Sequence, residues 1–278
     1  MVISMKKKMM SLLLAGTMVL GLCACGAAEE ETQADSVQVT DAVATEADNV
    51  FTVGFDQEFP PMGFVDENGE FTGFDLELAA EAAKRMGMEI ELQPISWDAK
   101  DMELESGTID CIWNGFTMNG REDGYTWTTP YMNNTQVFVV AADSGIETLA
   151  DLAGKTVEVQ ADSSAEAALK EMPDLMSSFG TVQTTPDYNT AFMDLEMGAV
   201  DAIAMDIIVA GYQIEQRQNG CVILDESIAS EEYGIGFKKG NEALRDKVQE
   251  ALEEMAADGT MTEISMKWFG EDVTTIGK

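Results

Sequence analysis

A short segment of this sequence occurs twice. "LESGTIDCIW" begins at Leu104 and "LEMGAVDAIA" begins at Leu195, an offset of 195 − 104 = 91 residues. In both copies a helix-compatible segment ends in a glycine, which suits the left-handed backbone at a helix C-terminus. An apolar run follows each glycine, at 109–113 and 200–205, and continuous apolar character is typical of a strand buried in a parallel sheet. The repeat predicts one α/β unit used twice, once in each of two similar lobes.

Predicted strands and helices alternate along the rest of the chain. Short apolar or alternating runs predict strands, and segments with apolar residues on one helical face predict helices. The predicted strands cover 51–55, 88–92 and 155–159, and the predicted helices cover 75–86, 165–172 and 243–259. This alternation favours an α/β fold in which each lobe is a mostly parallel sheet flanked by helices.

The N-terminus has the features of a secretory leader. Lysines at 6–8 precede an apolar run that ends at Leu22, so 1–24 is predicted to be a signal peptide. The "LCACG" at its end resembles the lipobox of bacterial lipoproteins, which implies lipidation of Cys25 and attachment to the outer face of the cell membrane. Lipidation of Cys23, or an ordinary signal peptide with incidental cysteines, are the alternatives. No later stretch approaches the roughly 20 apolar residues that a membrane-spanning helix needs.

A flexible tether is predicted between the leader and the folded body. Residues 27–49 contain seven acids, no aromatic residue and no proline. Such a segment cannot bury enough apolar surface to offset the entropy of ordering. We therefore predict that 25–49 is a lipidated cysteine with an acidic tether, and that the folded body begins at Val50.

Charge and composition exclude several classes of function. Cleavage after residue 24 removes three lysines and no acid, so the formal net charge changes from −35 to 13 − 51 = −38. Nucleic acid is not a predicted partner, since its phosphates require a basic surface. The chain has no histidine, which excludes Ser-His-Asp and Cys-His catalysis and the commonest metal ligand. Cys111 and Cys221 lie in apolar runs, so we predict buried thiols, no metal site and no cofactor.

The two copies of the repeat differ just after their strands, at the edge where open α/β sheets bind ligands. The first continues "NGFTMNGRED", which offers an amide, a hydroxyl and the cation Arg121, and the second continues with the carboxylate Asp206. A cleft with a positive and a negative side suits a zwitterion. Further along, "VEVQADSSAEAALKE" runs from a strand through Ser163 and Ser164 into a helix, and Ser163 with Glu166 has the spacing of a capping box. The free N–H groups of such a helix start favour a carboxylate.

At this point the sequence resembles a known family, the extracytoplasmic solute-binding proteins of ABC importers in the polar amino-acid group. The resemblance covers 53–270 and rests on several segments in order: "FPPMGFVDENGEFTGFDLELAAEAAKRMG", "LESGTIDCIWNGFT", "TTPYM", "GKTVEVQADSSAEAAL", "LEMGAVDAIAMD" and "DGTMTEISMKWFG". It implies the two-lobed, type II periplasmic-binding-protein fold with a hinge. Lobe 1 would comprise 50–141 and 230–278, and lobe 2 would comprise 142–229. The implied partners are a free amino acid and the membrane permease of the importer, and the implied state is a monomer.

The resemblance also implies roles for individual residues. Arg121 would pair with the ligand α-carboxylate, because a guanidinium binds a carboxylate through two parallel hydrogen bonds, and Asp206 would bind the α-ammonium. Thr117 and Ser164 would assist at the carboxylate, Phe59 and Trp97 would wall the side-chain pocket, Asp56 and Asn114 would lie at its polar end, and Gly115, Gln160 and Ser163 occupy positions that contact ligand in the family. Many members have four residues between the hydroxyl residue and the arginine. Here only three separate Thr117 from Arg121, which predicts a shortened turn at Asn119 and Gly120.

Each of these side chains also has a purely structural interpretation. The alternatives are a helix N-cap for Asp206, a surface ion pair with Glu122 or Asp123 for Arg121, caps or turns for Thr117, Ser163 and Ser164, core packing for Phe59 and Trp97, and a local turn for Asp56.

The leading hypothesis is therefore a binding protein that closes its lobes around an amino acid. An enzyme of the same fold, such as a dehydratase or a cell-wall hydrolase, is the second hypothesis, with carboxylates as general acid and base. A ligand-sensing receptor domain is the third, and the sequence shows no C-terminal spanning segment that would favour it. Glutamine, arginine, lysine, histidine and cystine all remain open as ligands.

Overall fold

The structure is a computed structural model that describes residues 49–218 and 220–278. The predicted signal peptide, Cys25, Cys23 and nearly all of the predicted tether lie outside the described residues. Within the described part of the chain, no helix is both long and apolar enough to cross a membrane.

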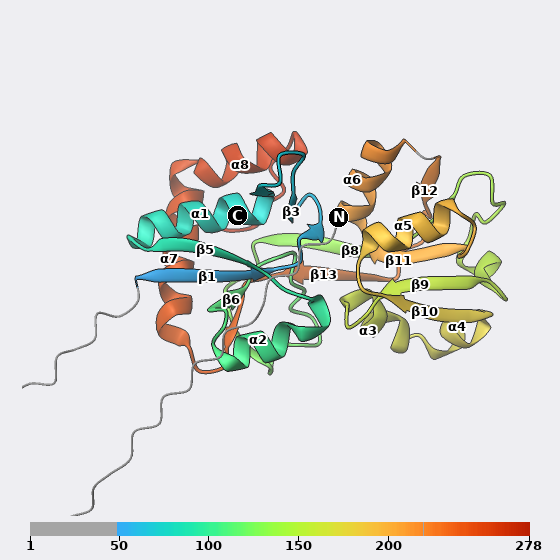
Figure 1. Cartoon of the computed structure of the whole chain (residues 1–278), viewed down its shortest axis with the longest axis horizontal. Coiled ribbons are helices and arrows are strands. Elements are labelled where there is room, and N and C mark those ends of the chain that lie inside the picture. Colours follow the sequence, from blue (N-terminus) through green and yellow to red (C-terminus); the bar gives the residue numbers. More distant parts are fainter. Residues whose placement is uncertain (1–48, 219) are drawn as a thin grey trace, which may run out of the picture. The chain divides into compact units, whose positions relative to one another are not determined.

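The first sheet has five strands (Figure 1). One of them, the fourth in spatial order, runs antiparallel to both of its neighbours, and the other four run in the same direction. In spatial order they are β5 (Glu89–Pro94), β1 (Val50–Phe55), β6 (Cys111–Ile112), β14 (Gly236–Lys238) and β7 (Tyr125–Trp127). Figure 1 shows α1 (Phe74–Met86) and α8 (Thr260–Phe269) on one side of this sheet and α2 (Lys100–Ser106) on the other.

The second sheet repeats this arrangement. In spatial order its strands are β10 (Thr181–Thr185), β9 (Thr156–Gln160), β11 (Ala202–Asp206), β8 (Met132–Ala141) and β12 (Cys221–Ile223), and β13 (Ala229–Tyr233) pairs with the first half of β8. Its helices are α3 (Ser164–Lys170), α4 (Pro173–Ser178), α5 (Tyr188–Glu196) and α6 (Ile207–Arg217). The strands β10, β9 and β11 are parallel, and β8 runs antiparallel to β11, β12 and β13.

The predicted repeat is visible in the fold, because β6 and β11 take the same place in the two sheets. Each strand follows a helix whose C-terminal glycine has the predicted left-handed backbone, with φ of 80° at Gly107 and 71° at Gly198. The expectation of mostly parallel sheets is confirmed, because one strand in each sheet runs against all the others. This strand is β14 in the first sheet and β8 in the second.

Two neighbouring strands carry the chain between the sheets. β8 and β13 pair antiparallel over 132–136 and 229–233, and beyond Gln136 β8 pairs with β11 and β12 of the second sheet. The second half of β8 thus belongs to the second sheet, and its first half pairs with β13. These two hydrogen-bonded strands connect the two sheets.

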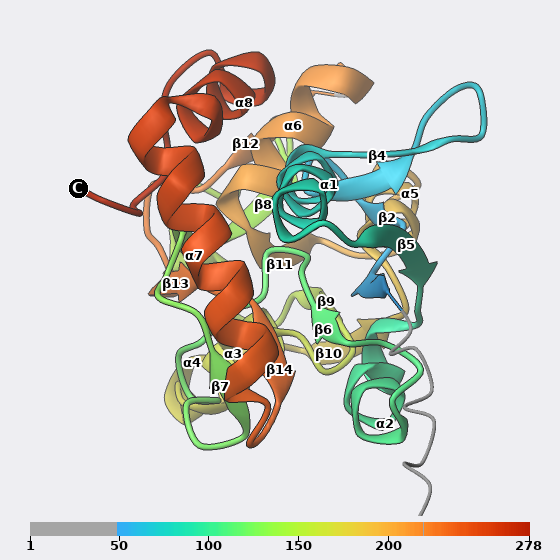
Figure 2. The ribbon, with the colours of Figure 1, turned by 90° about the vertical axis from the view of Figure 1, so that its left-hand side faces the viewer.

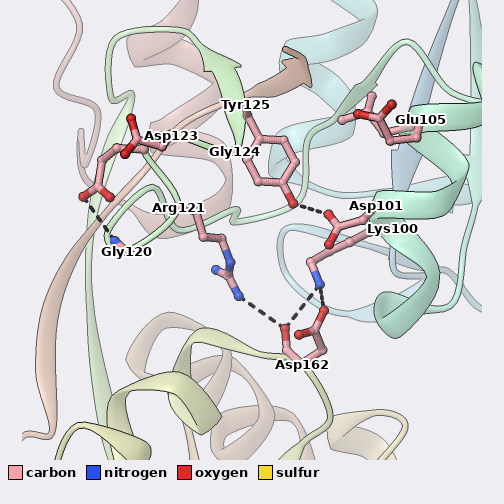
Figure 3. Close-up of a pocket in the computed structure, with 11 residues that line it drawn as sticks. Lys100, Asp101, Glu105, Gly120, Arg121, Asp123, Gly124, Tyr125 and Asp162 are labelled. Atoms are coloured by element: carbon pink, nitrogen blue, oxygen red, sulfur yellow. Dashed lines mark hydrogen bonds and ion pairs between the residues drawn. The ribbon is translucent and has the colours of Figure 1, made fainter.

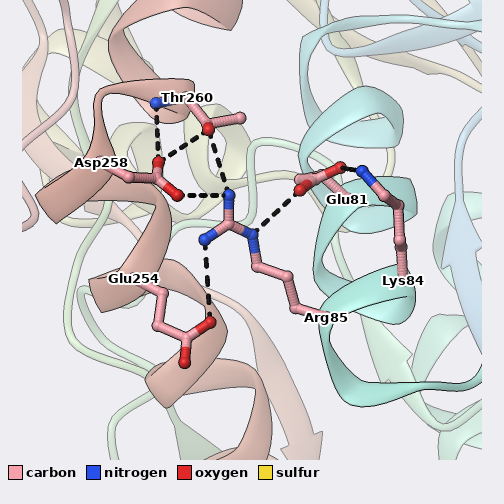
Figure 4. Close-up of polar contacts among 6 residues, drawn as sticks. All are labelled: Glu81, Lys84, Arg85, Glu254, Asp258 and Thr260. Atoms are coloured by element: carbon pink, nitrogen blue, oxygen red, sulfur yellow. Dashed lines mark hydrogen bonds and ion pairs between the residues drawn. The ribbon is translucent and has the colours of Figure 1, made fainter.

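The C-terminal helices return to the first sheet, where α7 (Glu242–Asp258) packs against α1 and α8. Figure 2 shows α7 running along this side of the molecule. Figure 4 shows how Arg85, in the last turn of α1, joins the helices: its guanidinium lies 2.8 Å from Asp258 and 3.7 Å from Glu254, and it donates to Thr260 at 3.1 Å. The Arg85 side chain is only 16% exposed, so this network fixes the C-terminal segment onto lobe 1.

The remaining short elements lie beside these layers. They are the three-stranded sheet of β2 (Glu58–Phe59), β3 (Gly63–Val65) and β4 (Phe71–Thr72), and single turns of 3-10 helix at Trp97–Ala99 and Leu149–Leu152. β2 places Phe59 toward α5 of the second lobe.

Candidate functional site

Asp206 is the last residue of β11, where the sequence predicts the ammonium-binding carboxylate. It occupies the N-cap position of α6, yet its side chain makes no capping hydrogen bond. Its Oδ1 instead accepts from Gln136 Nε2 at 2.6 Å, Asn134 Nδ2 at 2.7 Å and Tyr233 Oη at 2.7 Å. Asp206 is 4% exposed, and this burial, reinforced by the charge of Glu231, raises the pKa of its carboxyl well above the ordinary value. The carboxylate thus faces the connecting strands and not its own helix.

Glu231 is a second buried carboxylate at this site, and the sequence reasoning missed it. Its Oε2 accepts from Thr117 Oγ1 at 2.8 Å, Gln136 Nε2 at 3.0 Å and Asn134 Nδ2 at 3.2 Å. Glu231 and Tyr233 alternate with exposed Glu232 along β13, so the pattern "SEEY" could have indicated a strand with one buried face. The sequence analysis did not separate Glu231 from the rest of the 51 acidic residues.

Thr117 and Ser164 bring the two lobes together beside these carboxylates. Thr117 Oγ1 lies 3.2 Å from Ser164 Oγ, and Gln136 Nε2 donates to Ser164 Oγ at 3.0 Å. Ser163 caps α3 by accepting from the N–H of Glu166 at 3.1 Å, as predicted. The carboxylate of Glu166 binds the N–H of Asp162 instead of the cap residue's own N–H. The start of α3 is therefore ordered and adjacent to the first lobe.

Asp56, Asn114 and Gln160 form a second contact between the lobes. Gln160 Nε2 donates to Asp56 Oδ2 at 2.7 Å, and the N–H of Asp56 donates to Asn114 Oδ1 at 2.9 Å. Asp56 Oδ1 also accepts from the N–H of Glu58 at 2.9 Å, so the proposed turn is present as well. Burial raises the pKa of Asp56 to about 6. The structure thus joins three residues that the sequence analysis had grouped only through the family resemblance.

Phe59 and Gly115 lie close to one another at the lobe boundary. The Phe59 ring is 6.0 Å from the ring of Tyr188 on α5, so it contacts the second lobe. Gly115 has a φ of 55°, and a Cβ there would lie 3.0 Å from Phe59 and 3.2 Å from Tyr233. Its N–H donates to Asp75 Oδ2 at 2.6 Å. Glycine is therefore required at this position by both backbone conformation and space.

Trp97 packs in an apolar cluster and also lines a pocket. Its ring packs edge-on against Phe116 at 5.5 Å, within a buried apolar cluster. It also lines a pocket of about 310 Å³ together with Asp56 and residues from the second lobe, Ala161, Pro186 and Asp187. The pocket lies between the lobes, and four acids line it: Asp56, Glu58, Asp98 and Asp187.

Arg121 lies apart from Asp206. Its guanidinium donates to the carbonyl oxygens of Thr117 at 3.3 Å and Asp162 at 3.2 Å, and its carbon lies 5.3 Å from the ring centre of Phe116. Among the described residues no hydrogen bond or ion pair joins it to Asp206, Glu122 or Asp123. The predicted short turn is present, since the N–H of Arg121 donates to the carbonyl of Met118 at 2.9 Å. The arginine thus lies beside Thr117 and makes no direct polar contact with Asp206 among the described residues.

Figure 3 shows the pocket that Arg121 lines, with a volume of about 400 Å³. A second cation, Lys100 on α2, reaches the same residue of the other lobe: its ammonium forms an ion pair with the carboxylate of Asp162 and donates to the Asp162 carbonyl at 3.3 Å. Lys100 is 1% exposed. Two cations of lobe 1 therefore bind Asp162 of lobe 2, and these contacts hold the lobes together across the mouth of the pocket.

Replacing Lys100 by methionine should loosen this contact, since the aliphatic chain remains and the charge is lost. Asp162 is 55% exposed in its side chain, so we expect a shift of only about 1 kcal/mol toward an open arrangement of the lobes. The measurement is the radius of gyration of the protein without added amino acid, by small-angle X-ray scattering. Lys155→Met is the matched control, because Lys155 pairs with Asp201 inside lobe 2. An unchanged radius in Lys100→Met would show that other contacts hold the lobes.

Comparison with known proteins identifies the family of this chain. The model of the bacterial extracellular solute-binding proteins, family 3, matches residues 51–271. The L-cystine-binding protein TcyJ of Escherichia coli K12 is 35% identical over 225 residues, which cover 80% of this chain and 83% of that protein. The L-cystine-binding protein TcyA of Bacillus subtilis is 30% identical over 275 residues, which cover 97% and 100%.

A solved structure extends the agreement to the fold. A substrate-binding protein of an ABC uptake transporter from Streptococcus pneumoniae, with bound histidine, superposes with a TM-score of 0.79 at 36% identity, covering 82% of this chain and 95% of that one. The predicted type II fold is thereby confirmed, as is the predicted family, and membership implies a location outside the cytoplasm. The chain belongs to the bacterial extracellular solute-binding proteins, family 3.

Proposed function

We propose that this protein is the substrate-binding component of an ABC importer and captures a polar amino acid between its lobes. The observation that carries the proposal is the buried Asp206, which the amide of Gln136 links to Ser164 of lobe 2. The hydroxyl of Ser164 in turn lies 3.2 Å from that of Thr117 in lobe 1. Relatives whose names specify cystine, and a structural neighbour with bound histidine, support an amino acid as the ligand.

Both ends of a zwitterion have partners at this place. Asp206 would accept the α-ammonium. The hydroxyls of Thr117 and Ser164, which lie 3.2 Å apart, would donate to the α-carboxylate. Arg121 would add a bidentate pair by exchanging its two carbonyl contacts, one of which is to Thr117 itself, for the ligand carboxylate. A charged acceptor is a better partner for a guanidinium than a neutral carbonyl, so this exchange is favourable.

The side chain of the ligand would extend toward Asp56. Phe59 and Trp97 would form the walls of the side-chain pocket, because Trp97 lines the same pocket as Asp56. Gln160, which bonds to Asp56, would also contact the ligand, as would Asn114, Gly115 and Ser163. An acid next to an amide suits a polar or cationic side chain. Glutamine, arginine, lysine, histidine and cystine are the candidates.

The remaining parts of the proposal concern the membrane. Cys25 would be lipidated and hold the protein at the outer face of the cell membrane, and the closed lobes would dock as a monomer onto the permease. The first check is mass spectrometry of the N-terminal peptide of the mature protein. This peptide should carry an acylated Cys25. An unmodified Cys25 or an acylated Cys23 would contradict the proposed anchor.

The function is tested by thermal unfolding of residues 26–278, refolded to remove carried-over ligand, against each amino acid separately. At a free ligand concentration about 1,000 times the Kd, binding adds about 4 kcal/mol to the free energy of unfolding. For a body of this size we expect a rise in Tm of about 10 °C. Mass spectrometry of the ligand afterwards separates a binder, which returns it unchanged, from an enzyme of the same fold. No rise in Tm with any amino acid would contradict the proposal.

A further inference from the structure

The site contains two buried carboxylates that share the same hydrogen-bond donors. Gln136 Nε2 lies 2.6 Å from Asp206 Oδ1 and 3.0 Å from Glu231 Oε2, and Asn134 Nδ2 lies 2.7 Å and 3.2 Å from the same two oxygens. Because single nitrogen atoms bridge them, the two carboxylate oxygens are near neighbours. Among the described residues, no lysine or arginine bonds to either carboxylate.

These donors carry too few hydrogens for the acceptors around them. Gln136 Nε2 has two hydrogens and lies within bonding distance of three oxygens, since Ser164 Oγ is 3.0 Å away. Thr117 Oγ1 has one hydrogen and lies 2.8 Å from Glu231 and 3.2 Å from Ser164. With both carboxylates ionised, the cluster would hold two like charges out of water with unsatisfied lone pairs, which is strongly unfavourable. One added proton, or one cation, completes it.

We propose that the free protein keeps one proton on the Asp206–Glu231 pair and releases it when the α-ammonium of the ligand binds between the two carboxylates. The inference rests on the proposed function and adds Glu231 as a second acceptor for the ammonium. The proton passes to solvent as the ammonium brings its positive charge, so the net charge of the pair with its occupant is the same before and after binding. No covalent bond changes.

The groups around the pair do not offer another source of the proton. Tyr233 on β13 donates to Asp206, and burial keeps its pKa well above the ordinary value. Tyr188 on α5 also faces the pair, and burial raises its pKa in the same way. Both phenols therefore stay neutral in the physiological range. Asp56 is the next carboxyl, but its bonds go to Gln160 and the backbone of Glu58. The raised pKa of Asp206 agrees with a retained proton.

The proposal predicts that affinity rises with pH. Wherever binding releases one proton, the association constant increases about ten-fold per pH unit, and it becomes independent of pH once the pair is ionised in the free protein. The rise should lie within the range from pH 5.5 to 8. A binding site with a single ionised carboxylate would give a flat profile there.

The test is isothermal titration calorimetry of the mature protein at pH 6, in buffers of different ionisation enthalpy, with L-cystine, L-arginine and L-glutamine as probes. None of their side-chain groups gains or loses a proton between pH 5.5 and 7. Wild type should release about one proton per ligand bound. Glu231→Gln should release less than half of that, because the like charge is gone. Glu232→Gln, on the exposed face of the same strand, should match wild type. No proton release in wild type, or equal release in Glu231→Gln, would overturn the proposal.

A second measurement covers the case in which no probe binds, which would be a failure of the proposed function and not of the pair. The difference in Tm between pH 5.5 and pH 8 is measured without ligand for wild type, Glu231→Gln, Asp206→Asn and Glu232→Gln. Removing either member of a proton-sharing pair should reduce the fall in Tm toward pH 8, whereas Glu232→Gln should leave it as in wild type. If Glu231→Gln does not fold, Asp206→Asn gives the same comparison. Equal falls in all four proteins would overturn the inference.

Discussion

Replacing Asp206 by alanine should weaken amino-acid binding by about 100- to 1,000-fold. Loss of one member of a buried, hydrogen-bonded charge pair costs roughly 3 to 4 kcal/mol in binding, because the partner charge is left without compensation. Here the α-ammonium of the ligand would lose the Asp206 carboxylate and keep only Glu231, and the amides of Asn134 and Gln136 cannot accept it through their N–H groups. Calorimetric titration with the amino acid that gives the largest rise in Tm measures the change.

The controls separate a lost contact from a damaged fold. Asp225→Ala removes an exposed carboxylate of the same lobe and should bind as wild type. Arg121→Ala should cost less than Asp206→Ala, about 10- to 100-fold, since Thr117 and Ser164 still donate to the ligand carboxylate. Wild-type affinity in a folded Asp206→Ala protein would show that the ammonium binds elsewhere, and the proposed orientation of the ligand would be wrong.

The protein without ligand should become less stable as the pH rises from 4 to 8. Burial raises the pKa of Asp75 to about 7 and that of Asp56 to about 6. A carboxyl whose pKa is higher in the folded state binds more protons when folded, so the free energy of unfolding falls between the unfolded pKa, near 4, and the folded pKa. For Asp75 alone this amounts to an upper value on the order of 4 kcal/mol. Carboxylates with lowered pKa values, such as Asp258 at about 2, act only at lower pH.

Urea unfolding at pH 4.5, 6 and 8 measures this dependence, and Asp75→Asn assigns it. Asparagine keeps an oxygen that can accept from the N–H of Gly115 and the hydroxyl of Tyr131, which bind Asp75 Oδ2 at 2.6 and 2.9 Å, but carries no charge. The fall in stability between pH 4.5 and 8 should therefore shrink by about 2 to 4 kcal/mol relative to wild type. Asp225→Asn, at an exposed site, should not change it. Stability that rises toward pH 8 in wild type would contradict the assignment.

Much of this fold follows from local sequence patterns. The repeated segments at Leu104 and Leu195 predicted equivalent strands, and the glycines after each helix marked where those helices end, because only glycine takes a left-handed backbone at no cost. Asp206 could be singled out because it ends a buried strand at the ligand-binding edge of a sheet. The antiparallel strand in each sheet could not be foreseen, since the direction in which a distant strand returns is set by the whole chain.

The site was harder to predict where side chains from distant strands meet. Asn134, Gln136, Glu231 and Tyr233 lie on the paired strands β8 and β13, and each is buried only because the other strand and Asp206 cover it. Sequence alone presents Glu231 as one of many acids. The position of Arg121 depends on a short turn and on Asp162, 41 residues away, and no local pattern specifies such a contact.

The order of strands in the first sheet bears on how the polypeptide acquires its structure during synthesis. β14 lies between β6 and β7, although nearly all of the second sheet separates it from them along the chain. The second sheet draws its strands from one continuous stretch, 132–233, and can be completed as soon as that stretch is available. The first sheet stays split until Gly236–Lys238 arrives to bridge its halves. The amino-terminal strands, although made first, are thus among the last to find all their neighbours.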